Sequence, residues 1–116
     1  MVDLREYSDL IRELVAKENK KDRNWKWSVK SIGKKVVRIR WGYLDYLEEK
    51  NNCFFIGSEG DADCGNWLWI KTPDGRPIDC YMVAETPNPR IGAEMKIESG
   101  IRSAVEDIAY YAHSRY

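Results

Sequence analysis

Two runs of alternating residues between positions 25 and 41 constrain the fold of this chain more than any other feature. In the first run, 25–30, Trp, Trp and Val alternate with Lys, Ser and Lys; in the second, 37–41, Val, Ile and Trp alternate with two Arg. Successive side chains of a strand point to opposite faces, so each run predicts a half-buried strand. The segment 31–34 contains a glycine and predicts a short turn between them. The sequence therefore predicts a β-hairpin with one apolar face and one basic face.

The alternation also predicts which side chains of the hairpin share a face. We expect the core-facing set to be Trp25, Trp27, Val37, Ile39 and Trp41. We expect the solvent-facing set to be Lys26, Lys30, Arg38 and Arg40. A slip of one residue in the register would exchange the two sets, which makes this expectation sharp.

The middle of the chain predicts further antiparallel strands. The short apolar runs 53–56 and 67–70 are typical of buried strands, and the polar segment 57–65 between them predicts a loop. The segment 72–76 (Thr-Pro-Asp-Gly-Arg) combines residues that favour a turn. The alternation over 78–84 predicts the strand that returns from this turn.

Helical patterns lie at the two ends of the sequence. Apolar residues recur at helical spacing over 3–19 and again over 99–113, which predicts two amphipathic helices. The segment 42–50 fits either a continued strand or one or two helical turns. We expect one domain over residues 1–116, of class α+β: an antiparallel β-meander of about five strands with an N-terminal and a C-terminal helix packed on it.

Charge is strongly segregated along the chain. Residues 17–40 hold ten basic and two acidic residues, a net charge of +8, although the whole chain has a net charge of zero. Over 45–63 the sign reverses, with six acidic residues against Lys50. Such segregation places opposite fields on different surfaces and steers partners. The candidate binding residues are Lys26, Lys30, Lys34, Lys35, Arg38 and Arg40.

Two kinds of partner fit a basic face. Cations beside exposed aromatic rings can bind a nucleic acid, through phosphate contacts and base stacking. The tryptophans of the predicted hairpin lie on the face opposite the cations, so we expect an acidic protein surface, with nucleic acid as the alternative. The plain structural explanation is a solvated face whose lysines keep an edge strand from pairing with other chains.

The cysteine spacing argues against a metal or disulfide framework. Cys53, Cys64 and Cys80 are odd in number and lack paired C-x-x-C spacing, which predicts free thiols in a reducing, cytoplasmic compartment. A zinc site made by these thiols with His113 has no support from their positions.

The acidic segment 59–66 resembles the first half of a calcium loop. A calcium loop requires Gly at its sixth position and Glu at its twelfth, where this chain has Cys64 and Ile70. We therefore expect a solvated hairpin loop and no metal site.

One constellation has the form of an enzyme site. Asp79 on one strand, followed by Glu94 and Lys96 in an E-x-K pattern, would let two carboxylates hold Mg²⁺ while the lysine orients water. The pattern is similar to the D…E-x-K core of restriction-endonuclease-like nucleases, and the resemblance implies phosphodiester cleavage. Asp79 opens its predicted strand rather than closing it, so we expect the carboxylates not to converge.

No motif in the chain indicates a cofactor, and no window is apolar enough for a membrane span or a signal peptide. We expect a small, cytoplasmic, non-enzymatic protein that binds a macromolecule through charge-complementary surfaces. Immunity proteins, secretion chaperones, phage-encoded inhibitors and small adaptors share this size and architecture, and a fold alone does not choose among them. The alternative is a nucleic-acid-binding protein or the Mg²⁺-dependent nuclease just described.

Overall fold

Six strands form one sheet in which neighbours along the chain are also neighbours in the sheet. The structure is a computed structural model that describes residues 1–23, 25–43, 53–61, 65–88, 90 and 94–115. In chain order the elements are the 3₁₀ helix η1 (Leu4–Tyr7), α1 (Ser8–Lys21), β1 (Trp25–Ile32), β2 (Val36–Tyr43), β3 (Cys53–Asp61), β4 (Gly65–Lys71), β5 (Pro77–Ala84), β6 (Met95–Lys96) and α2 (Ile97–Arg115).

The predicted α+β class is confirmed, with one strand added. Strands β1 to β5 pair in antiparallel fashion, as a meander does. The short strand β6 lies beside β5 and is parallel to it, with Val83 opposite Met95. Two residues are too few to show a period of two, so the sequence pattern could not reveal this strand.

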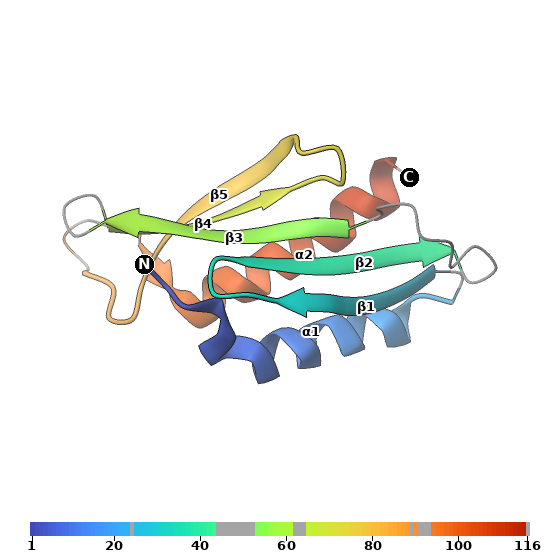
Figure 1. Cartoon of the computed structure of the whole chain (residues 1–116), viewed down its shortest axis with the longest axis horizontal. Coiled ribbons are helices and arrows are strands. Elements are labelled where there is room, and N and C mark those ends of the chain that lie inside the picture. The colour runs from blue at the N-terminus through green and yellow to red at the C-terminus, as the bar shows by residue number, and fades with distance from the viewer. Residues whose placement is uncertain (24, 44–52, 62–64, 89, 91–93, 116) are drawn as a thin grey trace.

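Both helices pack on the same face of the sheet. Helix α2 runs behind the sheet and α1 lies along β1 (Figure 1). The apolar stripes of the helices meet the sheet in a core whose largest fully buried side chains are Phe54, Leu4, Ile11, Ile39, Ile56, Leu68, Ile70, Ile101, Ile108, Val37, Val83 and Val105. Within the described part of the chain, no helix covers the opposite side of the sheet, which we call the open face.

The predicted orientation of the β1–β2 hairpin is confirmed. Trp27 and Trp41 are 3% exposed, and Val37 and Ile39 are fully buried. Trp25 is half-buried, and its ring stacks on that of Trp41 at 4.1 Å between centroids. The cations on the other face are exposed, except for Arg40, which is half-buried. A β-bulge between Val29 and Ser31 adds one residue to β1 and shifts the register toward the turn.

Two predicted boundaries need correction in the centre of the sheet. The segment 57–65 was expected to be a loop, but β3 continues to Asp61 and β4 begins at Gly65. Glu59 pairs with Trp67 across these strands, so polar residues here extend a hairpin rather than interrupt it. The ambiguous segment 42–50 begins by continuing β2 through Tyr43, and residues 44–50 lie outside the described residues.

The predicted turn after β4 is confirmed. The amide of Gly75 donates to the carbonyl oxygen of Thr72 at 2.9 Å, which closes a β-turn. Gly75 has a φ of 86°, a left-handed conformation that glycine adopts at little cost. The turn returns the chain into β5, whose inward side packs against α2.

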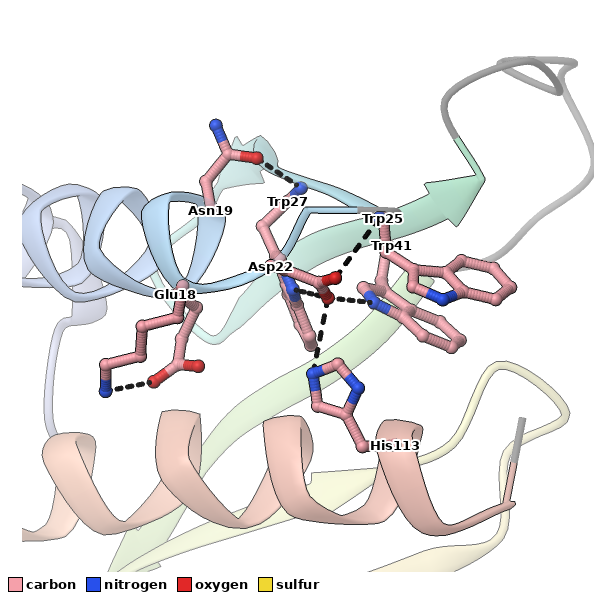
Figure 2. A network of polar contacts seen from close by, with 8 residues as sticks. Glu18, Asn19, Asp22, Trp25, Trp27, Trp41 and His113 are labelled. Carbon is pink, nitrogen blue, oxygen red and sulfur yellow. Dashed lines mark hydrogen bonds and ion pairs between the residues drawn. The ribbon is translucent and has the colours of Figure 1, made fainter.

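A buried carboxylate fixes the hairpin against both helices. Asp22 follows the last turn of α1, and its side chain is only 6% exposed. Its Oδ2 accepts hydrogen bonds from the indole Nε1 of Trp27 at 3.1 Å and of Trp41 at 3.4 Å. His113 on α2 places its Nε2 3.3 Å from the same oxygen (Figure 2). Because these donors belong to the inward-facing rings, the contact holds the tryptophans of β1 and β2 toward the helices.

The backbone of β1 is tied to the same place. The amide of Trp25 donates to Oδ1 of Asp22 at 3.2 Å, and the amide of Trp27 donates to Oδ1 of Asn19 at 3.0 Å (Figure 2). Two residues at the end of α1 therefore fix the first strand. With its register fixed in this way, the cations between the tryptophans can only point to the open face.

Candidate functional site

The open face carries the charged and aromatic side chains that the core does not use. In β4, Leu68 and Ile70 are fully buried toward the helices, so Trp67 and Trp69 point to the opposite side. The open face includes Lys26, Lys30, Arg38, Arg40, Phe55, Trp67, Trp69, Lys71, Cys80 and Met82.

Trp67 and Trp69 are the functional candidates that the sequence reasoning missed. Both are half-buried, and neither belongs to the hydrophobic core nor packs against it. The run 67–70 is apolar at every position, so its pattern assigns no face to either ring. The signal that could have found them is the pairing of Trp69 with Gly57, the residue of β3 that leaves room for a ring.

The indole of Trp69 lies flat on the open face. A Cβ atom added to Gly57 would lie 1.8 Å from Cζ2 of Trp69, so the ring fills the space above that glycine. Nζ of Lys71 lies over the same ring, 4.4 Å from its centroid, a cation–π distance. The indole therefore covers Gly57, and the ammonium group of Lys71 lies over the ring.

Phe55 lies beside a hollow at the basic end of the open face. This hollow has a volume of about 490 Å³ and is lined by Lys30, Ser31, Arg38, Cys53, Phe55 and Pro73. The guanidinium carbon of Arg38 lies 6.0 Å from the centroid of the Phe55 ring, and Nη1 of Arg38 donates to Oγ of Ser31 at 3.4 Å. Two cations and one ring thus border the same hollow.

Several cations of the open face have no acidic partner among the described residues. Among the described residues, Lys26, Lys30, Arg38 and Lys71 form no ion pair. The ion pairs that do occur are mostly local, such as that between Lys17 and Glu13 in α1. Charges left uncompensated on one face raise the local concentration of anions there.

Two predicted binding residues lie elsewhere. Lys34 and Lys35 are exposed in the turn between β1 and β2. Their carbonyl oxygens accept hydrogen bonds from the amides of Leu4 at 3.0 Å and Ser58 at 2.8 Å. They extend the positive field to the end of the hairpin, where Lys35 lines a hollow together with Glu59, Gly60 and Trp69.

The structure does not bring the nuclease-like residues together. Asp79 pairs with Ile70 near the start of β5, whereas Lys96 pairs with Ala84 at the end of the same strand. Five residues of strand separate these positions, a distance of about 17 Å. The carboxylate of Glu94 accepts from the amide of Asn88 at 3.3 Å. This arrangement offers no shared Mg²⁺ position for the three side chains.

The thiols are also apart. Cys53 is buried in β3 and Cys80 is exposed in β5, with β4 between them, and Cys64 lies outside the described residues. Partial burial, and then the charges of Asp79 and Glu59, raise the pKa of the Cys80 thiol, which disfavours the nucleophilic thiolate.

Metal ligands do not gather in the part of the chain that can be described. No three or more His, Cys, Asp or Glu side chains there are placed to hold a metal ion. Residues 62–64 of the acidic loop fall outside the described ranges. His113 lies instead in the contact with Asp22.

Comparison of the chain with known protein families, with curated proteins and with solved structures gave no match in any of the three. Within the described ranges, neither helix is long and apolar enough to cross a membrane.

Proposed function

We propose that this protein is a non-catalytic binding protein that engages a negatively charged macromolecule through the open face of its sheet. The observation that carries the proposal is a row of cations, Lys26, Lys30 and Arg38, that form no ion pair with any described residue. They lie beside aromatic rings on a face that no described helix covers. Inhibitors, immunity proteins and adaptors act by binding of this kind, without chemistry.

The charge of the open face favours a large anionic partner over a small one. The cations are spread along β1 and β2, over several residues of strand, and two of them, Lys30 and Arg38, line the hollow beside Phe55. A single small anion would reach only one or two of these groups. An extended partner can meet all of them, and the binding energy then grows with the number of contacts.

The positions of Trp67 and Trp69 bear on the choice between an acidic protein and a nucleic acid as the partner. The expectation of an acidic protein depended on the tryptophans of β1 and β2, which face the core. Trp67 and Trp69 lie on the same face as the cations, so the argument against a nucleic acid no longer applies. The separation of Asp79 from Lys96 offers no support for cleavage.

The proposal is tested with two charge-reversed variants that differ only in where the charge changes. The first replaces by Glu the open-face residues Lys26, Lys30, Arg38 and Arg40. The matched control replaces by Glu four exposed cations elsewhere, Arg12, Lys20, Arg90 and Arg102. Both variants change the net charge equally. We expect the first to elute from immobilised heparin, a general polyanion, at much lower salt than the second.

Equal loss of retention in the two variants would show that only net charge matters, and would overturn the proposal. Equal retention of both, at the level of the unmodified protein, would show that the basic residues of the open face are only a solvated surface. Circular dichroism of each variant verifies that the fold is kept.

A further inference from the structure

We infer that the partner of the open face is a single-stranded nucleic acid, whose bases stack on Phe55, Trp69 and Trp67 while its phosphates meet the neighbouring cations. This inference rests on the proposed function and names the chemistry of its partner. It follows from the way in which the rings lie, from their spacing and from the position of the charges around them.

The ring of Trp69 lies along the sheet rather than projecting from it as an anchor. Trp69 lies flat above Gly57, and the cations of Lys71 and Arg38 lie over the faces of Trp69 and Phe55. Aromatic anchors of protein interfaces instead insert into pockets of the partner. An aromatic ring that lies on a sheet surface is what a base stacks on, and sheet surfaces bind single-stranded nucleic acids in this way.

The strand positions that carry the three rings are evenly spaced. Trp67 and Trp69 are two residues apart on one side of β4, which separates them by about 7 Å. Phe55 is opposite Lys71 and is therefore the diagonal neighbour of Trp69, again at about 7–8 Å. Equal steps let successive bases of one strand each meet one ring.

The cations border this row of rings. Lys30 and Arg38 line the hollow beside Phe55, and Lys71 lies between Phe55 and Trp69. Glu59 is opposite Trp67 at the other end, where its negative charge repels phosphate. The phosphate path therefore begins at the basic end, in the β1–β2 hairpin. A duplex fits this row of rings poorly, because its bases already stack on one another.

The test measures the affinity of the protein for a fluorescent oligothymidine of about 12 nucleotides, a length within the range of single-strand sites. The variants Phe55→Leu and Trp67→Leu remove one ring each and keep an apolar side chain. The control Tyr110→Leu removes an aromatic residue of α2 that is 77% exposed and lies outside the open face. We expect each open-face variant to lose roughly tenfold in affinity and the control to lose none.

A second variant tests the phosphate contacts without changing any buried side chain, so that its fold is kept. Lys30→Ala combined with Arg38→Ala changes exposed side chains only. Each phosphate contact with a single strand contributes roughly 0.7 to the slope of log affinity against log salt, so this variant should flatten the slope by roughly 1.4. A duplex of the same sequence length should compete weakly.

Three results would overturn the inference. Binding of polyglutamate but not of oligothymidine would show an acidic protein as the partner class, and the proposed function would stand. No binding of oligothymidine, polyglutamate or heparin would overturn the inference and the proposed function together. Affinity for oligothymidine that is unchanged in Phe55→Leu and Trp67→Leu would also contradict it, because the rings would then not stack on bases.

Discussion

The two halves of the sheet present their tryptophans to opposite sides. In β1 and β2, Trp27 and Trp41 are 3% exposed and bond to the buried carboxylate of Asp22. In β4, Trp67 and Trp69 lie on the open face, outside the core. Tryptophan therefore stabilises the core in β1 and β2, and it forms part of the open face in β4.

The difference shows that the neighbours along the strand decide which face of the sheet a tryptophan occupies. In β1 and β2 the residues between the tryptophans are mostly cations, which cannot be buried unpaired, so the rings must face inward. In β4 the intervening residues, Leu68 and Ile70, are fully buried and force the rings outward. Gly57 then provides the space in which Trp69 lies.

The largest expected effect separates the two kinds of tryptophan directly. Trp27→Ala removes a buried ring from the core and should lower the free energy of unfolding by about 3–5 kcal/mol. Trp67→Ala removes a half-buried ring that lies outside the core, and should cost about 1 kcal/mol. Equilibrium unfolding in urea measures both. Equal losses would break the comparison between the two halves.

Removing the Asp22 carboxylate should cause the next largest loss of unfolding free energy. Asp22→Ala leaves the indole N–H groups of Trp27 and Trp41 without this acceptor, and should cost about 2–3 kcal/mol of unfolding free energy. Asp22→Asn keeps an acceptor oxygen and should cost less. His113→Ala removes a partner of Asp22 whose side chain is 49% exposed, together with its edge contact to the Trp41 ring, and should cost about 1 kcal/mol. An Asp22→Ala variant as stable as the unmodified protein would show that the carboxylate does not hold the rings.

Gly57 gives a smaller effect that is specific to the open face. Gly57→Ala displaces the indole of Trp69 and should cost about 1–2 kcal/mol of unfolding free energy. In a Trp69→Ala background the same change should cost almost nothing, because no ring remains to be displaced. A double-mutant cycle measures this coupling. A cost that is the same in the two backgrounds would mean that the ring does not lie over the glycine.

The smallest expected effect concerns the inward side of β5. Burial, and then the neighbouring carboxylate of Asp107, raise the pKa of the Tyr81 hydroxyl above its usual value. The folded state therefore holds this proton more strongly than the unfolded state, and the stabilisation is complete below about pH 10 and falls as the pH rises further. Melting temperatures from pH 8 upward should fall less steeply for Tyr81→Phe than for the unmodified protein. The exposed control Tyr110→Phe should follow the unmodified protein.

The sequence predicted most of the fold because its local patterns were unambiguous. Within the two runs 25–30 and 37–41, every alternate position except Ser28 is charged, and the turn over 72–76 has residues with strong conformational preferences. The strand β6 is too short to show a period. The extension of β3 to Asp61 depends on its pairing with β4 and not on its own composition.

The candidate site was predicted only in its basic half. The cations of β1 and β2 follow from alternation, whereas the face of Trp67 and Trp69 depends on which side of β4 the helices cover. The role of Asp22 depends on contacts with β1, β2 and α2, which come from distant parts of the chain. No local pattern contains that information.

The most direct test of the account follows the five indole N–H signals in ¹⁵N NMR spectra while unlabelled oligothymidine is added. Single Trp→Phe variants assign the signals. We expect the signals of Trp67 and Trp69 to shift and those of Trp27 and Trp41 to stay in place. Shifts confined to Trp27 and Trp41, or no indole shift while the oligonucleotide binds, would contradict the claim that the outward-facing rings form the binding surface.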